Sequence, residues 1–208
     1  MATQVQTVLV ADGDRGCADS LAQLLNRHGV EASSTYDGLE AIHLAQRMRP
    51  QNVIMDVELP GTSGFEVASE LRTAFARAIR LVAYTGHPLT VDRRRVRESG
   101  FDEWVPKTTP VLDLLRATSP ALHETVLRSI AVNVRQMRNQ LTLASSLLTH
   151  VESTRDAAMR RRLHDFLASR IEGVVASMSR LLPAGAPERA ELWAEAEAMR
   201  ERLERFFA

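Results

Sequence analysis

The sequence predicts a doubly wound α/β fold with a five-stranded parallel sheet, followed by an all-helical domain. Up to residue 117, short apolar runs alternate strictly with segments of helical periodicity, a pattern typical of a parallel sheet covered by helices. From residue 119 onward the strand signal stops, and apolar residues recur every three or four positions. We therefore expect two domains, residues 1–117 and residues 118–208.

The strongest strand signal is the run NVIM at residues 52–55, which ends at Asp56 and a loop rich in Pro and Gly. An apolar run bounded by turn residues indicates a buried strand of a parallel sheet. The other expected strands cover residues 7–11, 30–34, 79–84 and 102–105. The expected helices cover residues 15–28, 38–48, 65–75 and 90–99, and a fifth starts after Pro110.

Polar side chains follow four of these strands at their carboxyl ends. They are Asp12, Asp14, Asp56, Thr85 and Lys107, the sole lysine of the chain. Carboxyl ends of parallel strands meet at one edge of the sheet, where ligands bind. Clustered carboxylates favour a hard cation such as Mg2+, and a central carboxylate can attack a phosphoryl group. A hydroxyl and an ammonium group nearby can hold the phosphoryl oxygens.

The stretches VLVADGD, TYDGLEAI, VIMDVELPGTSGFEV, LVAYTG and GFDEWVPK resemble the receiver domains of two-component response regulators, over about residues 5–117. The resemblance implies that Asp56 is the phosphoacceptor, served by a histidine kinase or phosphotransfer protein. It implies that Thr85 is the switch hydroxyl, that Lys107 pairs with the phosphoryl group, and that Trp104 swings inward on activation. It also implies that the domain catalyses only its own phosphorylation and dephosphorylation.

Two positions depart from the family pattern. The family usually has two adjacent acids after the first strand, but here Gly13 follows Asp12 and the next acid is Asp14. Either Asp14 reaches back, with Gly13 permitting the backbone, or Mg2+ is held more weakly through Asp12, Asp56 and a carbonyl. On this basis Gly13→Asp is expected to tighten Mg2+ binding. The second departure is Thr108, where the family commonly has a proline after the lysine.

The C-terminal half carries an apolar heptad seam on each of three expected helices, about residues 120–151, 155–182 and 188–207. The seam residues are Leu127, Ile130, Val134, Met137, Leu141, Ala144, Leu148 and Val151 on the first helix, Met159, Leu163, Leu167, Ile171, Val174, Met178 and Leu181 on the second, and Leu192, Ala196, Met199, Leu203 and Phe206 on the third. Such seams are typical of coiled coils and helix bundles. We expect a homodimer through helices 120–182 that forms a four-helix bundle. The alternative is that the third helix folds back and completes a monomeric three-helix bundle.

The stretch RQMRNQLTLASSLL, residues 135–148, resembles the first helix of the dimerisation hairpin of histidine kinases. Asn139 and Arg138 match that family's Asn and Lys, but Arg135 stands where the family has its reactive histidine. The half therefore resembles a kinase hairpin without its chemistry. Three histidines, His123, His150 and His164, keep open the alternative of a phosphotransfer protein that relays phosphate between an aspartate and a C-terminal histidine.

Composition limits the remaining classes. Lys and Arg together equal Asp and Glu at 26 each, and no helix-turn-helix pattern is present, so we expect no specific DNA binding. We expect no membrane segment, since no apolar run approaches the ~20 residues of a span. A single cysteine, Cys17, suits a reducing cytoplasm. The expected output is therefore contact with another protein.

Overall fold

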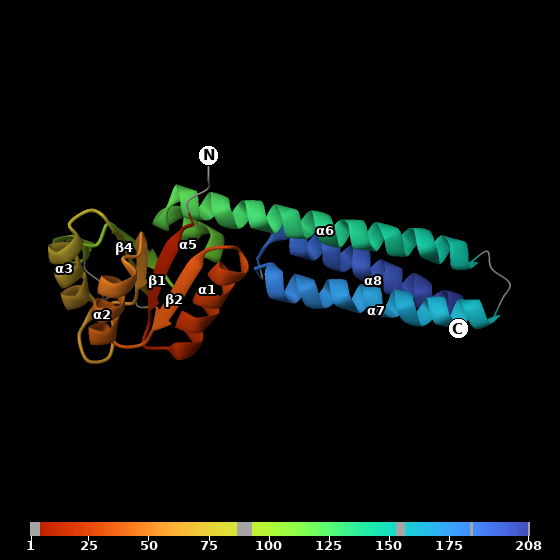
Figure 1. The fold of residues 1–208 in the computed structure, drawn as a ribbon, viewed down its shortest axis with the longest axis horizontal. Coiled ribbons are helices and arrows are strands. Elements are labelled where there is room, and N and C mark those ends of the chain that lie inside the picture. Colours follow the sequence, from red (N-terminus) through yellow and green to blue (C-terminus); the bar gives the residue numbers. More distant parts are fainter. Residues whose placement is uncertain (1–4, 87–92, 153–156, 184, 208) are drawn as a thin grey trace. The chain divides into compact units, whose positions relative to one another are not determined.

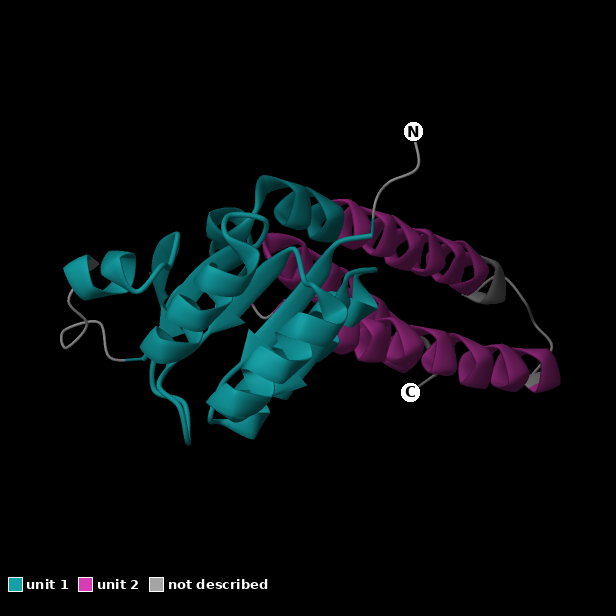
Figure 2. Ribbon diagram, turned by 60° about the vertical axis from the view of Figure 1, so that its left-hand side comes forward, with its two compact units in different colours: residues 1–127 teal, residues 128–208 magenta. Residues whose placement is uncertain are grey.

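The computed structural model describes residues 5–86, 93–152, 157–183 and 185–207, and the chain divides into two compact units. Unit 1 covers Met1–Leu127 and unit 2 covers Arg128–Ala208 (Figure 2). The start of the helix expected at 90–99 and the side chains of His150, Val151 and Phe206 lie outside the described part. No helix in the described part is both long and apolar enough to cross a membrane.

Unit 1 contains a five-stranded parallel sheet with helices between the strands (Figure 1). The strand order is β2-β1-β3-β4-β5, which confirms the predicted doubly wound fold. The strands are β1 Thr7–Ala11, β2 Glu31–Thr35, β3 Asn52–Met55, β4 Arg80–Thr85 and β5 Glu103–Pro106. The helices are α1 Arg15–Arg27, α2 Gly38–Met48, α3 Gly64–Phe75, α4 Arg93–Glu98 and α5 Val111–Thr118.

The central strand β3 is buried along its whole length, as its apolar sequence predicts. It pairs with β1 on one side, where Leu9 faces Val53, and with β4 on the other. Because β1 and β3 are neighbours although β2 lies between them in the chain, the strand order reverses at β1. The carboxyl ends of β1 and β3 therefore flank the position where this fold binds ligands.

Helix α3 begins unusually close to the end of β3. A Cβ atom at Gly64 would lie 2.3 Å from the backbone oxygen of Asp56, so only glycine fits there. Ser63 caps the helix: its hydroxyl accepts from the amide of Glu66, and the Glu66 side chain accepts from the Ser63 amide. This tight loop fixes the backbone that carries Asp56.

Helix α6, Pro120–Glu152, crosses the division between the two units, which falls between Leu127 and Arg128. Its early residues Leu122 and Val126 are fully buried and belong to unit 1. The compact unit thus extends past the boundary expected at residue 117. The sequence boundary is placed where the strand pattern ends. That criterion cannot show which unit the first residues of the continuous helix α6 belong to.

Unit 2 contains the rest of α6, with α7, Ala157–Leu181, and α8, Pro187–Phe207 (Figure 1). The three helices bury the predicted seam over most of its length, at Ile130, Val134, Met137, Leu141, Ala144 and Leu148 of α6, Leu167, Ile171, Val174 and Met178 of α7, and Leu192, Ala196 and Leu203 of α8. Leu127, Leu163, Leu181 and Met199 are only partly buried.

The seam prediction is wrong at Met159, whose side chain is 51% exposed. Met159, Leu163, Leu167 and Ile171 are separated by successive steps of four residues. Each such step rotates about 40° beyond one full helical turn, so Met159 has drifted about 80° away from the Leu167 position. A seam stays straight only when steps of three and four alternate.

Helix α8 packs on α6 within the same chain. The Arg138 guanidinium donates to Glu191 at 2.7 Å and to Glu195 at 3.3 Å, and Arg202 donates to the hydroxyl of Thr149 at 3.2 Å. The α6 seam is therefore covered in a single chain, which is the three-helix alternative named above. A seam left in water was the reason to expect a second hairpin. The homodimer and its four-helix bundle stay predictions.

Candidate phosphoacceptor site

The predicted site residues of unit 1 converge on the carboxyl edge of the sheet. Asp12 follows β1, Asp56 follows β3, Thr85 is the last residue of β4, and Lys107 follows β5. Asp12, Asp56 and Lys107 border a pocket of about 520 Å³. The lining residues of that pocket are Asp12, Gly13, Asp14, Asp56, Glu58, Leu59, Pro60, Gly86 and Lys107.

Lys107 joins the two central carboxylates. Its Nζ lies 2.6 Å from Oδ2 of Asp12 and 2.6 Å from Oδ2 of Asp56. The second oxygen of each carboxylate accepts a backbone amide, from Asp14 to Asp12 at 3.0 Å and from Glu58 to Asp56 at 3.2 Å. Both carboxylates are thus fixed in orientation by one shared ammonium and one local N–H each.

The two carboxylates change the pKa of Lys107. Burial lowers the pKa of its ammonium, but hydrogen bonds and charge attraction from Asp12 and Asp56 outweigh burial and raise the pKa above the usual lysine value. A raised pKa stabilises the fold at every pH below the unfolded value of about 10.4, and that stabilisation is lost only on further alkalinisation. Lys107 therefore remains a cation across the physiological range.

Asp14 does not join the central carboxylates. It is the N-cap of α1, and its Oδ1 accepts the amides of Gly16 at 2.8 Å and Cys17 at 3.2 Å. An aspartate at this position satisfies amides that the helix leaves unpaired. Within the part of the chain that the structure describes, no three His, Cys, Asp or Glu side chains are placed to hold a metal ion. The expected metal set of Asp12, Asp14 and Asp56 is not assembled.

Gly13 is closely covered by the loop after β3. A Cβ atom added at Gly13 would lie 3.0 Å from Cδ of Pro60 and 3.6 Å from the backbone oxygen of Glu58. Pro60 therefore fills the space beside the position where the family usually carries its second acid. The residues present do not fit the usual metal set of the family, because position 13 supplies no carboxylate and Asp14 is engaged elsewhere.

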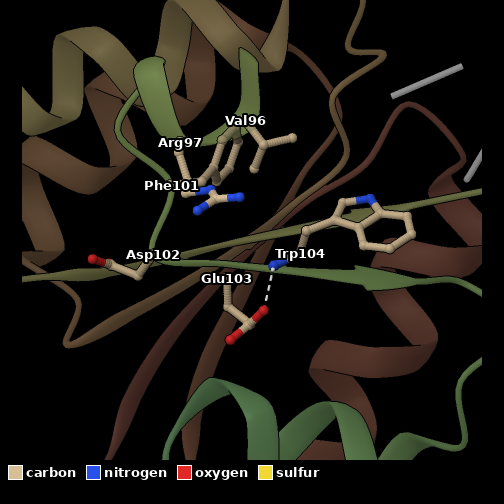
Figure 3. Close-up of a pocket in the computed structure, with 6 residues that line it drawn as sticks. All are labelled: Val96, Arg97, Phe101, Asp102, Glu103 and Trp104. Carbon is tan, nitrogen blue, oxygen red and sulfur yellow. Dashed lines mark hydrogen bonds between the residues drawn. The ribbon is translucent and has the colours of Figure 1, made fainter. Parts of the chain in front are cut away.

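The two predicted switch residues differ in burial. Thr85 is fully buried, and its carbonyl accepts the amide of Lys107 at 2.8 Å. Trp104 on β5 is half-buried against the core of unit 1. It lines a second pocket of about 300 Å³ with Val96, Arg97, Phe101, Asp102 and Glu103. Figure 3 shows the Trp104 and Glu103 side chains leaving β5 on opposite sides, as neighbours on a strand do.

Sequence reasoning missed Cys17 as a neighbour of the site. Burial, a hydrogen bond to Asp12 and the Asp12 charge together raise the pKa of its thiol to about 11. Cys17 lies in the first turn of α1, one helical turn from the Asp14 cap. Its position there could have been found from the short loop between Asp12 and the helix start.

The candidates of the C-terminal half are dispersed. Arg135 and Asn139 are exposed on α6, and Arg138 is engaged by Glu191 and Glu195 of α8. His123 is half-buried, in the part of α6 that belongs to unit 1. His164 on α7 has Nδ1 3.2 Å from the carboxylate of its neighbour Asp165. These two histidines thus belong to different units.

A family model described as the response regulator receiver domain matches residues 8–119, more than half of the chain. The chain belongs to the response regulator receiver domain family. Its receiver is thus a component of two-component signalling, as the sequence motifs predict. The match ends at the start of α6 and leaves the nature of the helical half open.

Curated relatives agree with this assignment. The chain is 28% identical over 136 residues to the response regulator MprA of Mycobacterium avium (strain 104), covering 65% of the chain and 59% of the relative. It is 30% identical over 118 residues to MprA of Mycobacterium sp. (strain KMS), covering 57% of the chain and 51% of the relative. The chain thus spans little more than half of these relatives.

Solved structures agree in fold. A CheY-like receiver domain protein from Methanospirillum hungatei JF-1 is 20% identical, with a TM-score of 0.53 over 59% of the chain and 97% of that structure. The signal receiver domain of an HD domain-containing protein from Pseudomonas fluorescens Pf-5 is 20% identical, with a TM-score of 0.53 over 60% of the chain and 92% of that structure. At this identity the likeness shows the fold alone.

Proposed function

We propose that the protein is a response regulator in which Asp56 accepts a phosphoryl group and the helical half passes the signal to another protein. The observation that carries the proposal is the Asp56 carboxylate itself. It stands at the end of the central strand β3, nearly buried, held by Lys107 and the Glu58 amide beside an open pocket. A carboxylate fixed in this way is placed for attack rather than for a structural ion pair alone.

The donor in this proposal is a phosphorylated histidine of a partner histidine kinase or phosphotransfer protein. An Asp56 oxygen attacks phosphorus, the new P–O bond forms as the P–N bond breaks, and the imidazole leaves with the electron pair and takes up a proton. The product is an acyl phosphate on Asp56. The protein acts as an enzyme only toward its own phosphorylation and dephosphorylation.

Lys107 has the next role in this proposal. Its ammonium offsets the charge of Asp12 and Asp56 before transfer and can then pair with a phosphoryl oxygen without leaving the site. Thr85 supplies the hydroxyl that follows the phosphoryl group, and Trp104 on the adjacent strand β5 changes position with it. These two roles rest on the family resemblance, on the Thr85 carbonyl that accepts the Lys107 amide, and on the position of Trp104 in the strand that leads to Lys107.

We propose that Mg2+ binds this site more weakly than it binds receivers with an acid at position 13. Affinity in oxygen-ligand sites follows the number of ligand charges, and Lys107 already pairs with the two central carboxylates, Asp12 and Asp56. When bound, the metal would supply positive charge to the transferring phosphoryl group.

The proposed output is protein contact and homodimer formation through helices 120–182, without DNA binding or membrane attachment. The support is the balanced charge of the chain and its long helical half. A mobility shift that persists at high salt with any defined duplex would overturn the part of the proposal that concerns DNA.

The test is phosphoryl labelling by acetyl phosphate or a cognate kinase, read by intact mass. Asp56→Asn should abolish the label, since an amide keeps the shape of the carboxylate but is not a nucleophile. Asp14→Asn is the matched control, because Asp14 caps α1 instead of facing Lys107. Undiminished label in Asp56→Asn would overturn the assignment.

The second candidate function, a phosphotransfer protein with an active C-terminal histidine, has His164 and its contact with Asp165 in its favour. Phosphohistidine is labile in acid, whereas the acyl phosphate of Asp56 is labile in base. Label that survives base, disappears in acid and is lost in His164→Gln would establish the second candidate.

A further inference from the structure

Apolar side chains are unusually exposed on the outside of unit 2. Six of the eight large apolar residues that are exposed in the described part belong to this unit. On α6, Leu143 is 62% and Leu147 is 37% exposed, and on α7 Phe166 is 45% exposed. These three residues do not belong to the buried seam, so packing within the chain does not explain them.

The α6 residues of this set lie on the side of the helix turned away from α8. The contacts to α8 come from Arg138 and Thr149. At about 100° per residue, Leu143 lies roughly 140° around the helix from Arg138, and Leu147 roughly 160° from Thr149. The two leucines therefore face away from the helix that already covers α6.

Phe166 of α7 lies on the same outer side. Helices α6 and α7 lie side by side and run in opposite directions (Figure 1), and Leu143 is as far from the end of α6 as Phe166 is from the start of α7, so the two residues stand at about the same level. Phe166 is about 100° around the helix from Leu167 and about 140° from Ile171, which is about a third of a turn from their buried line.

Seen down α6 from its N-terminus, Arg138 and Thr149 place α8 on the clockwise side of the seam. On the antiparallel α7, seen from its own N-terminus, the side away from α8 is therefore reached counterclockwise, and this is the direction in which Phe166 lies from Leu167. We call Leu143, Leu147 and Phe166 the outer apolar strip.

Arginines outnumber acidic residues along the two helices that carry the outer apolar strip, and one of them, Arg170, contacts the strip itself. Residues 128–181 contain nine arginines and four acidic residues, and no acidic residue lies between 125 and 151. The Arg170 guanidinium stacks over the Phe166 ring, 5.0 Å from its centroid. A second copy of the same surface would bring arginine against arginine, which disfavours a two-fold dimer through this strip.

Helix α8 is an example of a helix that packs on α6. It carries six acidic and four basic residues over 187–207, and its Glu191 and Glu195 both reach Arg138 while Leu192 and Ala196 are buried. An acidic amphipathic helix thus already covers one side of α6. The outer apolar strip offers the same combination of leucine and arginine on the other side, with no helix of this chain left to cover it among the described residues.

We propose that the outer apolar strip is a docking site for an acidic amphipathic helix of a partner protein. The proposal rests on the proposed function, since it names the surface through which the helical half contacts its output partner. The apolar face of the partner helix packs on Leu143, Leu147 and Phe166, and its carboxylates face the arginines of α6 and α7. The contact combines apolar burial with charge complementarity.

The test uses the full-length protein and a fluorescent 21-residue synthetic helix with a leucine seam and glutamate at the other positions. Its control has the same seam with lysine in place of glutamate. Fluorescence anisotropy should show saturable binding of the glutamate peptide, weakened by added salt, and about tenfold weaker binding of the lysine peptide. Equal binding of both peptides, or binding of neither, overturns the proposal.

Two variants locate the binding. Leu143→Ser should weaken binding of the glutamate peptide about tenfold, whereas Leu39→Ser, which removes a leucine of similar exposure (54%) from α2 of unit 1, should leave binding unchanged. Both positions are exposed, so both variants should fold, which circular dichroism checks. Equal binding by the Leu143→Ser variant and the unaltered protein places the peptide elsewhere and overturns the proposal.

Other occupants give different results. A concentration-dependent dimer in light scattering that Leu143→Ser abolishes assigns the strip to a second copy, and binding of phosphatidylserine vesicles that Leu143→Ser abolishes assigns it to a lipid surface; either overturns the proposal. Asp56 labelling is measured in the same samples. Lost peptide binding with intact labelling refutes the docking site alone, and lost labelling with intact peptide binding refutes the phosphoacceptor alone.

Discussion

The ion cluster around Lys107 in unit 1 and the one around Arg138 in unit 2 differ in burial. In unit 1, Lys107 lies between the nearly buried carboxylates of Asp12 and Asp56. In unit 2, Arg138 pairs with Glu191 and Glu195, and all three side chains are exposed. Exposed pairs are worth about 0–1 kcal/mol, whereas loss of one partner from a buried pair is strongly destabilising. Loss of a charged partner should therefore cost more stability at Lys107 than at Arg138.

The largest expected effect comes from a substitution that unfolds unit 2 and leaves unit 1 folded. Leu141→Arg places a charge at a position that is 2% exposed, in the centre of the α6 seam. The expected cost is about 3–5 kcal/mol, from lost packing and an unpaired buried charge. Circular dichroism should show loss of helix, while Asp56 labelling is retained. Leu143→Arg is the matched control, since Leu143 is exposed on the same helix, and it should leave helix content unchanged.

Light scattering on the full chain and on residues 1–127, the whole of unit 1, decides the homodimer prediction. A full-length protein that stays near its chain mass of 23.1 kDa at high concentration excludes the dimer. In that case the three-helix arrangement of α6, α7 and α8 is complete by itself, and the contrast between the units concerns one chain only.

The second prediction concerns the Mg2+ affinity of the site in unit 1. Gly13→Asp alone should change Mg2+ affinity little, because its Cβ meets Pro60 at 3.0 Å. Gly13→Asp combined with Pro60→Ala should tighten Mg2+ binding about tenfold, since a ligand charge is added where space has been made. Titration followed by Trp104 fluorescence measures both, with Pro60→Ala alone as the control. Equal dissociation constants in all variants would show that position 13 does not face the metal.

The third prediction concerns the thiol beside the site. With a pKa of about 11, Cys17 should be alkylated by iodoacetamide at pH 8 about a hundredfold more slowly than in the unfolded chain. Asp12→Asn should lower that pKa and speed alkylation several-fold, because it removes a negative charge beside the thiolate. Asp19→Asn on the same helix is the control. No acceleration in Asp12→Asn would contradict the contact.

The raised pKa of the Cys17 thiol also determines how folding stability depends on pH. The unfolded thiol ionises near pH 8.5, whereas the folded thiol resists ionisation up to about 11. The thiol therefore contributes its full stability below pH 8.5, and this contribution falls between pH 8.5 and 11. Urea unfolding of Cys17→Ser should show a weaker alkaline loss of stability than the unaltered protein.

The smallest expected effect belongs to the exposed pairs of unit 2. Arg138→Ala should lower the free energy of unfolding by less than about 1 kcal/mol, and 0.5 M salt should reduce the difference further. Urea unfolding of both proteins measures this. A loss above about 2 kcal/mol would mean that Arg138 with Glu191 and Glu195 behaves like a buried network, and the contrast between the units would disappear.

The amino-acid order alone predicted the sheet and the edge that carries the site. The run at 52–55 predicted a buried strand because apolar residues between turn signals have few alternatives, and β3 lies at the centre of the sheet. The amino-acid order alone assigned Asp12, Asp56, Thr85 and Lys107 to one edge, because all strands of a parallel sheet end on the same side. Periodicity likewise predicted the buried seam of α6.

Several residues have more than one compatible partner, and contacts between distant segments select among them. Asp14 could cap α1 or face the metal site, and the amides of Gly16 and Cys17 engage it. Pro60 closes the space over Gly13 from a loop on another strand. Helix α8 covers a seam that equally suits a second chain. The local sequence shows which polar groups and apolar faces need a partner. The packing of segments that are distant in the chain determines which partner each of them contacts.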